Sequence, residues 1–337
     1  MAAATTTPTS KQSWWPLFWG LAALLLLPLG PPLNEVFPID QTLVLLVPAV
    51  AACAIVGWKV GGRAALAIVW LVFATWILLQ PAGSPGTPYD QMARGWAILL
   101  AASFGLVSLW SAALPFFVRA LTAVGVATAV GLMIALSSPS GIARFQHAAE
   151  SEFTRRASTA IERIQTARDT PQWKDLAAKA PWLDAVYDEN EIVIREIPEH
   201  AAGLLPALLA LESLAALALG WGIYQRLSSV KIGPPLSPLT EFRFNDQLVW
   251  AVAVGATLVL LPTFADGRNA GFNLLAFFGV LYLLRGLGVL AWITKGRYLV
   301  LGILSLIPPF GVMLGVLALA LGLGDTWLDL RRRARAS

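Results

Sequence analysis

Apolar runs of about twenty residues recur along this chain, and they limit its fold more than any other feature. An α-helix needs about 20 apolar residues to cross the hydrocarbon core of a bilayer. Hydrophobic residues make up 57% of the 337 positions and charged residues 13%, whereas a soluble domain carries roughly 25% charged residues. The sequence therefore predicts an all-α membrane protein, a polytopic transmembrane helical bundle.

Nine runs are candidates for membrane spans. They lie near residues 14–30, 41–58, 64–80, 95–113, 116–137, 201–224, 247–265, 271–293 and 298–323. The motif IPPF interrupts the last run, so we expect about 8 to 10 spans. One Lys precedes the first run, which resembles a signal peptide, but the many runs that follow favour a retained first span.

A polar segment, residues 140–200, separates the spans. It divides the chain into an N-terminal part, 1–139, with spans one to five, and a C-terminal part, 201–337, with the remaining spans and a basic tail. In its first half, apolar residues recur at intervals of three and four, which predicts an amphipathic helix. That helix needs a surface, which is the bilayer interface, its own bundle or a partner. The second half predicts a short helix, a turn at Pro181, a second helix and a short strand in EIVIRE.

Basic residues in the short loops predict the orientation. A cytoplasmic N-terminus places nine of them inside and only Arg94 and Arg268 outside; the nine are Lys11, Lys59, Arg63, Arg119, Arg226, Lys231, Arg243, Lys295 and Arg297. The polar segment then lies outside. Nine crossings would also place the tail RRRAR outside, so we expect IPPF to bend the last span into a hairpin or re-entrant pair, or one earlier candidate not to cross.

Sequence motifs for catalysis or cofactor binding are absent. There is no GxSxG, HExxH, Walker loop or GxGxxG, so we expect no enzymatic activity and no cofactor. Cys53 is the one cysteine, and His147 and His200 lack neighbours at ligand spacing, so we expect no metal site. The formal charge of +4 is small and indicates no binding of nucleic acid.

Small residues recur at every fourth position in two spans. They are Ala123, Ala127, Gly131 and Ala135 in the fifth span, and Gly311 with Gly315 and Ala318 with Gly322 in the last. Small residues let helix backbones approach closely in a membrane. We interpret them as packing faces of a compact bundle, with a ligand groove as the alternative.

Ionisable residues inside spans are the best candidates for a functional site, because a central charge costs about 2.5 to 3.5 kcal/mol on insertion. Glu212 is near the middle of its span, and Arg285 lies at a depth that differs by roughly 4.5 Å. We therefore predict that the two form a buried ion pair, and that Asn273, just inside the same span as Arg285, adds to this cluster. The pair either fixes helix register or forms a solute or proton site.

Other acidic residues and asparagines lie at the ends of the C-terminal spans. They include Asp246 in EFRFNDQLVW, Asp266 in FADGRNAGFN, and Asp325 and Asp329 in GLGDTWLDLRRR. Helix capping is the usual role of Asp and Asn at such positions, and it is the role we expect for Asp246 and Asp266.

The C-terminal half resembles the YybS-like family of predicted bacterial multi-pass membrane proteins, whose function is unknown. The stretches that carry the resemblance are LLPALLALESLAALALGWGIYQRL, FRFNDQLVWAVAVG, NLLAFFGVLYLLRGLGVLAW and LGLGDTWLDLRRR, within about residues 200–335. That family is distantly similar to the substrate-binding components of energy-coupling-factor vitamin transporters. The resemblance implies solute binding or uptake, although those components have about six helices and lack a polar cap.

These observations predict a non-enzymatic solute-binding or transport-related component of a bacterial cytoplasmic (inner) membrane. Its expected partners are the lipid bilayer, a small solute and other membrane or envelope proteins. The alternative is a structural or assembly factor of the cell envelope that acts through residues 140–200. A polar cavity around Glu212 and Arg285 would favour the first function, and a packed bundle with an exposed apolar stripe on the cap would favour the second.

Overall fold

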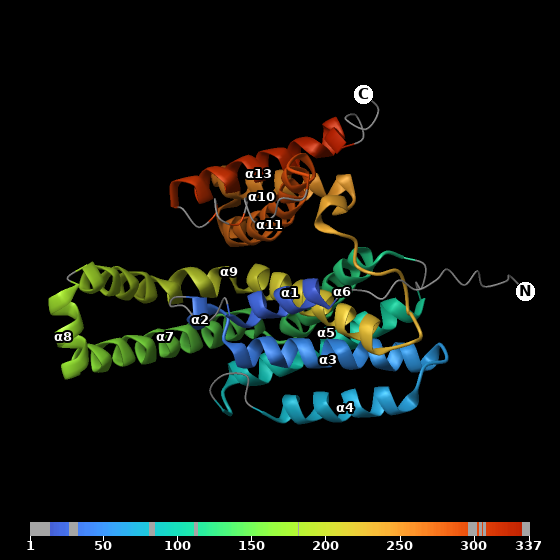
Figure 1. The fold of residues 1–337 in the computed structure, drawn as a ribbon, viewed down its shortest axis with the longest axis horizontal. Helices are drawn as coiled ribbons and strands as arrows, with labels where there is room; N and C mark the ends of the chain where they lie inside the picture. The colour runs from blue at the N-terminus through green and yellow to red at the C-terminus, as the bar shows by residue number, and fades with distance from the viewer. Residues whose placement is uncertain are drawn as a thin grey trace, which may run out of the picture. The chain divides into compact units, whose positions relative to one another are not determined.

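The computed structural model describes residues 14–26, 33–80, 85–110, 114–180, 182–295, 302, 305 and 308–331. These residues form helices joined by short loops and no strand (Figure 1), which confirms the all-α fold. They group into two compact units. The first unit contains residues 1–199 and 213–235, and the second contains residues 200–212 and 236–337.

The N-terminal unit is built on one strongly buried helix. Helix α3 (Ile39–Lys59) buries most of its residues and packs against α4 (Ala64–Leu79) and α5 (Pro88–Trp110). Helix α6 (Phe116–Leu136) packs against α5. Two shorter helices, α1 (Trp15–Leu26) and α2 (Leu33–Val36), precede this group.

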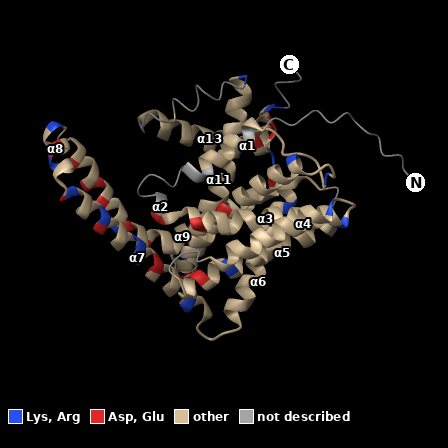
Figure 2. Ribbon diagram, turned by 60° about the horizontal axis from the view of Figure 1, so that its bottom comes forward, with Lys and Arg blue, Asp and Glu red and all other residues tan. Residues whose placement is uncertain are grey.

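A long helical hairpin carries most of the charged residues of this unit. Helix α7 (Gly141–Arg168) is followed by the short α8 (Pro171–Lys179) and then by α9 (Trp182–Leu227), which runs back beside α7 (Figure 1). Arg168 joins the ends by binding the carboxylates of Asp184 at 3.2 Å and Asp188 at 2.7 Å. Figure 2 shows blue and red residues concentrated along α7 and α8.

The amphipathic helix predicted in the first half of the polar segment is confirmed as α7. It buries Ala149, Phe153 and Ala157 and contacts α2, α5 and α6, so its own bundle provides much of the surface it needs.

The predicted strand EIVIRE is wrong, because these residues lie within α9. Ile194, Ile197 and Ala201 are buried, while Ile192 and Val193 are exposed. The buried residues are three and four apart, which is helical periodicity. A strand of so few residues would also have no partner strand, whereas the helix continues directly into the following span.

An irregular segment at the end of α9 has its backbone carbonyls satisfied by side chains of its own unit. Four side chains donate hydrogen bonds to these carbonyls, with donor–acceptor distances of 2.8 to 3.1 Å. Tyr224 binds the carbonyl of Val230, Arg119 that of Ile232, Gln225 that of Gly233 and Trp221 that of Pro234. Arg119 is fully buried and lies 5.1 Å from the Trp221 ring centroid. From the sequence, Arg119 was counted among the basic residues of the short loops, whereas in the structure it lies in the first turn of α6 and holds this segment in place.

Besides residues 200–212 of α9, the described part of the C-terminal unit contains three apolar helices. Helix α10 (Val249–Leu260) follows the 3-10 turns η2 (Leu239–Glu241) and η3 (Asp246–Leu248). The turn η4 (Pro262–Gly267) leads to α11 (Arg268–Ile293), which packs against α10 and α13 (Pro308–Leu328). Gly255 of α10 meets Gly271 of α11 backbone to backbone, so these two helices form an antiparallel hairpin.

Helices α11 and α13 touch through glycines. A Cβ atom added at Gly286 would lie 1.6 Å from the carbonyl oxygen of Ala318, and one at Gly322 would lie 1.9 Å from that of Tyr282. The same two Cβ atoms would each lie 2.9 Å from the backbone nitrogen of the other glycine, so Gly286 and Gly322 lie level with each other. Toward the C-terminal ends of both helices, Arg285 meets Asp325, and Gly288 lies beside Arg331, which follows α13. Both helices advance in the same direction, so α11 and α13 are parallel.

The parallel arrangement of α11 and α13 bears on the position of the basic tail, which nine crossings would have placed outside. The C-terminal ends of α11 and α13 lie at one end of the unit, and Arg331 binds the carbonyls of Thr240 and Phe242 there. Arg243 lies at the same end, bound to Asp329. The motif IPPF is residues 307–310, and its Pro308, Pro309 and Phe310 are the first residues of α13. Residues 296–307, where the first half of the predicted bend would lie, are outside the described residues except for 302 and 305.

Six of the described helices are long and apolar enough to cross a membrane: α3, α5, α6, α9, the η4–α11 stretch and α13. Helix α4 and residues 246–260 are apolar but shorter. Of the predicted spans, 41–58, 64–80, 116–137 and 271–293 match described helices within about three residues. Others shift, and the last begins at Pro308 and not at 298.

We predict that the α7–α9 hairpin lies outside and the basic tail inside. A Cys placed at the exposed Ser158 of α7 should react with a membrane-impermeant maleimide in intact cells, and Cys at Ser229 or Ser337 should react only after lysis. The native Cys53 is fully buried and contributes little background. Labelling of the Ser337 site in intact cells would contradict the orientation of the C-terminal unit.

The glycine contacts predict a second set of variants. Gly286→Ala and Gly322→Ala should each destabilise the protein by about 1 to 3 kcal/mol, because the added methyl group meets backbone atoms that cannot move aside. Gly315→Ala is the matched control in α13, since its Cβ would have nothing within 4 Å. Thermal unfolding of the purified protein in detergent measures the difference, and equal midpoints for all three variants would refute the close contact.

Candidate functional site

Arg285 is the centre of a cluster of charged residues in the C-terminal unit. It is the eighteenth residue of the 26-residue α11, so it lies beyond the middle of the helix toward its C-terminal end. The residue is 1% exposed. A buried guanidinium needs acceptors for its N–H groups and a compensating negative charge.

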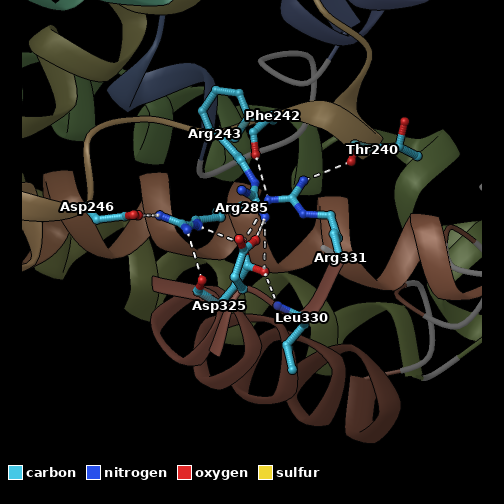
Figure 3. Close-up of polar contacts among 9 residues, drawn as sticks. Thr240, Phe242, Arg243, Asp246, Arg285, Asp325, Leu330 and Arg331 are labelled. Carbon is cyan, nitrogen blue, oxygen red and sulfur yellow. Dashed lines mark hydrogen bonds and ion pairs between the residues drawn. The ribbon is translucent and has the colours of Figure 1, made fainter. Parts of the chain in front are cut away.

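Asp325 of α13 provides the main compensation. Arg285 Nε donates to Asp325 Oδ2 at 3.0 Å, and Arg285 Nη2 donates to the Asp325 backbone carbonyl at 3.1 Å. The Asp325 side chain is fully buried. Because the glycine contact brings α11 and α13 so close, the short Asp side chain is long enough to reach the guanidinium (Figure 3).

Asp325 also binds the tail of the chain. Its Oδ2 accepts from Arg331 Nη2 at 2.9 Å, and its Oδ1 accepts from the Leu330 backbone N–H at 3.1 Å. Arg331 Nη1 donates to the Thr240 carbonyl at 2.8 Å. One carboxylate therefore ties the end of α13 to α11, and Arg331 ties both to the segment before α10.

Asp246 is the exposed partner of Arg285. Arg285 Nη1 donates to Asp246 Oδ1 at 2.6 Å. The Asp246 side chain is 60% exposed, in contrast to the buried Asp325. Arg243 and Asp329, also partly exposed, pair with each other beside Asp325. The cluster of Arg243, Asp246, Arg285, Asp325, Asp329 and Arg331 thus carries three positive and three negative charges.

Aromatic rings cover part of the Arg285 guanidinium. Its Cζ lies 5.6 Å from the Phe244 ring centroid, a distance at which a cation is attracted to the ring face. Phe244 in turn packs edge-on against the buried Tyr282, with ring centroids 5.0 Å apart. The rings cover this side of Arg285, whereas its contact with Asp246 lies on the exposed side.

Arg285 does not pair with Glu212 as the sequence analysis predicted. Within the described residues, its three side-chain nitrogens bind Asp325 and Asp246. Helices α9 and α11 are level at Gly203 beside Asn269 and at Ala207 bonded to Asn273. Glu212 is then about seven residues short of Arg285 along parallel helices, or roughly 10 Å. Glu212 is buried elsewhere along α9.

Asn273 binds the backbone of α9 and not the charged cluster. Its Oδ1 accepts from the Ala207 N–H at 2.9 Å, and its Nδ2 donates to the Gly203 carbonyl at 2.7 Å. That carbonyl is the usual helical partner of the Ala207 N–H, four residues earlier. The Asn273 amide therefore bridges one turn of α9 directly after Pro206, which has no N–H to donate.

The acidic partners of Arg285 were not predicted from the sequence, because Asp and Asn residues near helix ends usually act as caps. Asn245, not Asp246, caps η3, with its Oδ1 accepting from the Gln247 N–H at 3.0 Å. Asp325 lies inside α13, three residues before its end. The signal that identifies Asp325 is its position one turn after Gly322, on the packing face that the small residues define.

The chain is similar over residues 183–326 to a family described as predicted membrane proteins (DUF2232). No curated protein and no solved structure matches the chain significantly. The matched stretch begins at the start of α9 and includes Arg243, Asp246, Arg285 and Asp325. Together with the six helices able to span a bilayer, this similarity identifies the chain as a multi-pass membrane protein.

Burial predicts an order of effects within the cluster. Asp325→Asn should cost the most, about 3 to 5 kcal/mol, because it leaves both Arg285 and Arg331 without their buried carboxylate. Arg285→Met should cost somewhat less, because Asp325 keeps Arg331. Asp246→Asn should cost about 1 kcal/mol or less, since exposed ion pairs are weak.

The measurement is thermal unfolding of the purified variants in one detergent. Equal losses for Asp246→Asn and Asp325→Asn would show that the buried carboxylate has no special part in stability.

Proposed function

We propose that the protein is a non-enzymatic, transport-related component of a bacterial cytoplasmic membrane, and that it binds an anionic solute at Arg285. The observation that supports the proposal is the asymmetry of the Arg285 contacts. Asp325 fixes two of its nitrogens from a fully buried position, while the third faces the exposed Asp246. The resemblance of the C-terminal half to the YybS-like family, which is distantly similar to substrate-binding components of vitamin transporters, implies the same class of function.

Asp246 then occupies the position that a solute carboxylate or phosphate would take. Removing Asp246 without a replacement would leave Arg285 less compensated, which is unfavourable for a buried charge. An anionic solute restores the lost hydrogen bond and the lost charge, whereas a neutral solute restores only the first. The site therefore favours anions, and under the predicted orientation it opens toward the cytoplasm.

A direct test compares binding of anions by the parent protein and by Asp246→Asn. The variant removes the internal competitor, so its affinity for carboxylate or phosphate anions should rise about twofold to fivefold, the range expected for a solvent-screened ion pair. Arg285→Met should lose affinity by about 10-fold to 100-fold, because it removes a charged hydrogen bond. Citrate, succinate and inorganic phosphate are suitable probes, measured by intrinsic tryptophan fluorescence against chloride at equal ionic strength.

Asp266→Asn is the matched control for this test. Asp266 is an exposed carboxylate in η4, at the opposite end of the α10–α11 hairpin, and its removal should leave the affinities unchanged. If Asp246→Asn binds all three anions no more tightly than the control, Asp246 does not occupy a solute position and the proposal is wrong.

The envelope-factor function is a second candidate, and one observation favours it. Trp182, Val186 and Val193 are exposed apolar residues on the outer part of α9, and their spacing of four and seven places them on one helix face. A shallow hollow of about 400 Å³ lies at the end of the same hairpin, between Arg168, Trp173 and Asp184 among others.

Complementation of a deletion strain separates the two candidates. A solute-binding component should lose function with Arg285→Met and keep it with Val186→Ser and Val193→Ser. An envelope factor acting through the hairpin should show the reverse pattern.

A further inference from the structure

A second polar cluster is buried in the N-terminal unit, at the end where α3 and α5 begin. Its members are Glu35 of α2, Gln41 of α3, Tyr89 of α5, and Glu152 and Arg156 of α7, all less than 9% exposed. Tyr89 Oη donates to Gln41 Oε1 at 2.7 Å. Burying this much polar surface is costly unless each group is compensated, so the contacts of each member matter.

Arg156 is incompletely satisfied within this cluster. Its Nε donates to Glu152 Oε1 at 2.9 Å, and its Nη1 donates to the backbone carbonyl of Glu35 at 3.3 Å. Its guanidinium lies over the Tyr89 and Phe153 rings, at 5.0 and 5.6 Å from their centroids. Its Nη2 is buried and has no hydrogen-bond acceptor among the described residues. Arg156 thus keeps an unpaired donor group on the same guanidinium that binds the backbone of Glu35.

The two carboxyl groups near Arg156 are in opposite electrostatic environments. Burial tends to raise the pKa of Glu152, but hydrogen bonds from Arg155 and Arg156 outweigh it, and the pKa is lowered. Burial also raises the pKa of Glu35, and here the charges of Arg163, Arg156 and Arg155 only partly offset it, so the pKa stays raised. Carboxyl pairs whose environments separate their pKa values are typical of sites where one group carries a proton.

We propose that Glu35 is a proton-binding site, in which the buried carboxyl takes up a proton near Arg156 and turns toward Arg156 Nη2 when it ionises. The short α2 carries Glu35 and packs on α7, so the two protonation states differ in how α2 is attached to the hairpin. Under the predicted orientation the site lies at the outer side of the membrane. This inference is independent of the solute site at Arg285.

The charged groups around Glu35 come from three helices. Helix α7 presents Glu152, Arg155, Arg156 and Arg163. At the starts of the two neighbouring spans, Asp90 of α5 is buried and paired with Arg94, while Asp40 of α3 is exposed. Asp90 and Glu152 each bind an arginine side chain, whereas Glu35 is the carboxyl of this cluster whose pKa is raised by burial.

The test follows the carboxyl group of Glu35 in the full-length protein in lipid nanodiscs. Infrared difference spectra recorded on stepping the pH should show a protonated carboxyl band that persists above the ordinary range of a solvated Glu, and Glu35→Gln should remove it. Asp40→Asn is the matched control and should leave the band unchanged. A band that survives in Glu35→Gln, or no band above the ordinary range in the parent, overturns the proposal.

Stability against pH gives an independent readout. A carboxyl whose pKa is higher in the folded state binds its proton more tightly there, so the parent loses stability as the pH rises from the unfolded pKa through the folded one. Glu35→Gln cannot ionise, so it should be more stable than the parent at neutral pH and equal to it below the ordinary Glu pKa.

If Glu35→Gln does not fold, Glu35→Asp keeps an ionisable group, and the infrared band should shift in frequency. Identical pH profiles for parent and Glu35→Gln, or an unshifted band in Glu35→Asp, would also overturn the proposal.

Discussion

The absence of water from the hydrocarbon core of a bilayer explains most of the polar contacts in this protein. A backbone group or a charge that is buried there must find its partner within the chain. Arg285 takes both a carboxylate oxygen and a backbone carbonyl from Asp325. Asn273 bridges an N–H and a carbonyl of α9 beside Pro206, and Arg119 with its neighbours satisfies the carbonyls of the irregular segment after α9.

Helical periodicity and apolar length were sufficient to predict the class of fold and most of the helices. The pattern failed where a short apolar stretch fits two structures. In EIVIRE, the β-branched residues favour a strand, but Ile194 continues a buried helical face through Ile197 and Ala201. Length decides such cases, and here the helix runs for 46 residues, which local propensity does not show.

The charged site was only partly predictable. Arg285 was identified because a charge within an apolar span needs compensation, but its partner was sought by depth alone. Depth does not say which helices touch, and α11 meets α13 through Gly286 and Gly322. Had the small residues of α13 been used to choose the neighbour of α11, Asp325, one turn beyond Gly322, would have been the nearest carboxylate. The spacing of small residues thus indicated the packing face that carries Asp325, but which helix lies against that face was known only from the structure.

The order of Asp246, Arg285 and Asp325 along the chain has a consequence for biosynthesis. The chain is made from its N-terminus, and Asp325 lies 40 residues after Arg285, whereas Asp246 lies 39 residues before it. When α11 enters the membrane, its buried partner does not yet exist, and Asp246 is the one bound carboxylate already synthesised. Asp246 is therefore available to neutralise Arg285 before α13 is made, and in the folded protein it is the exposed partner beside the buried Asp325.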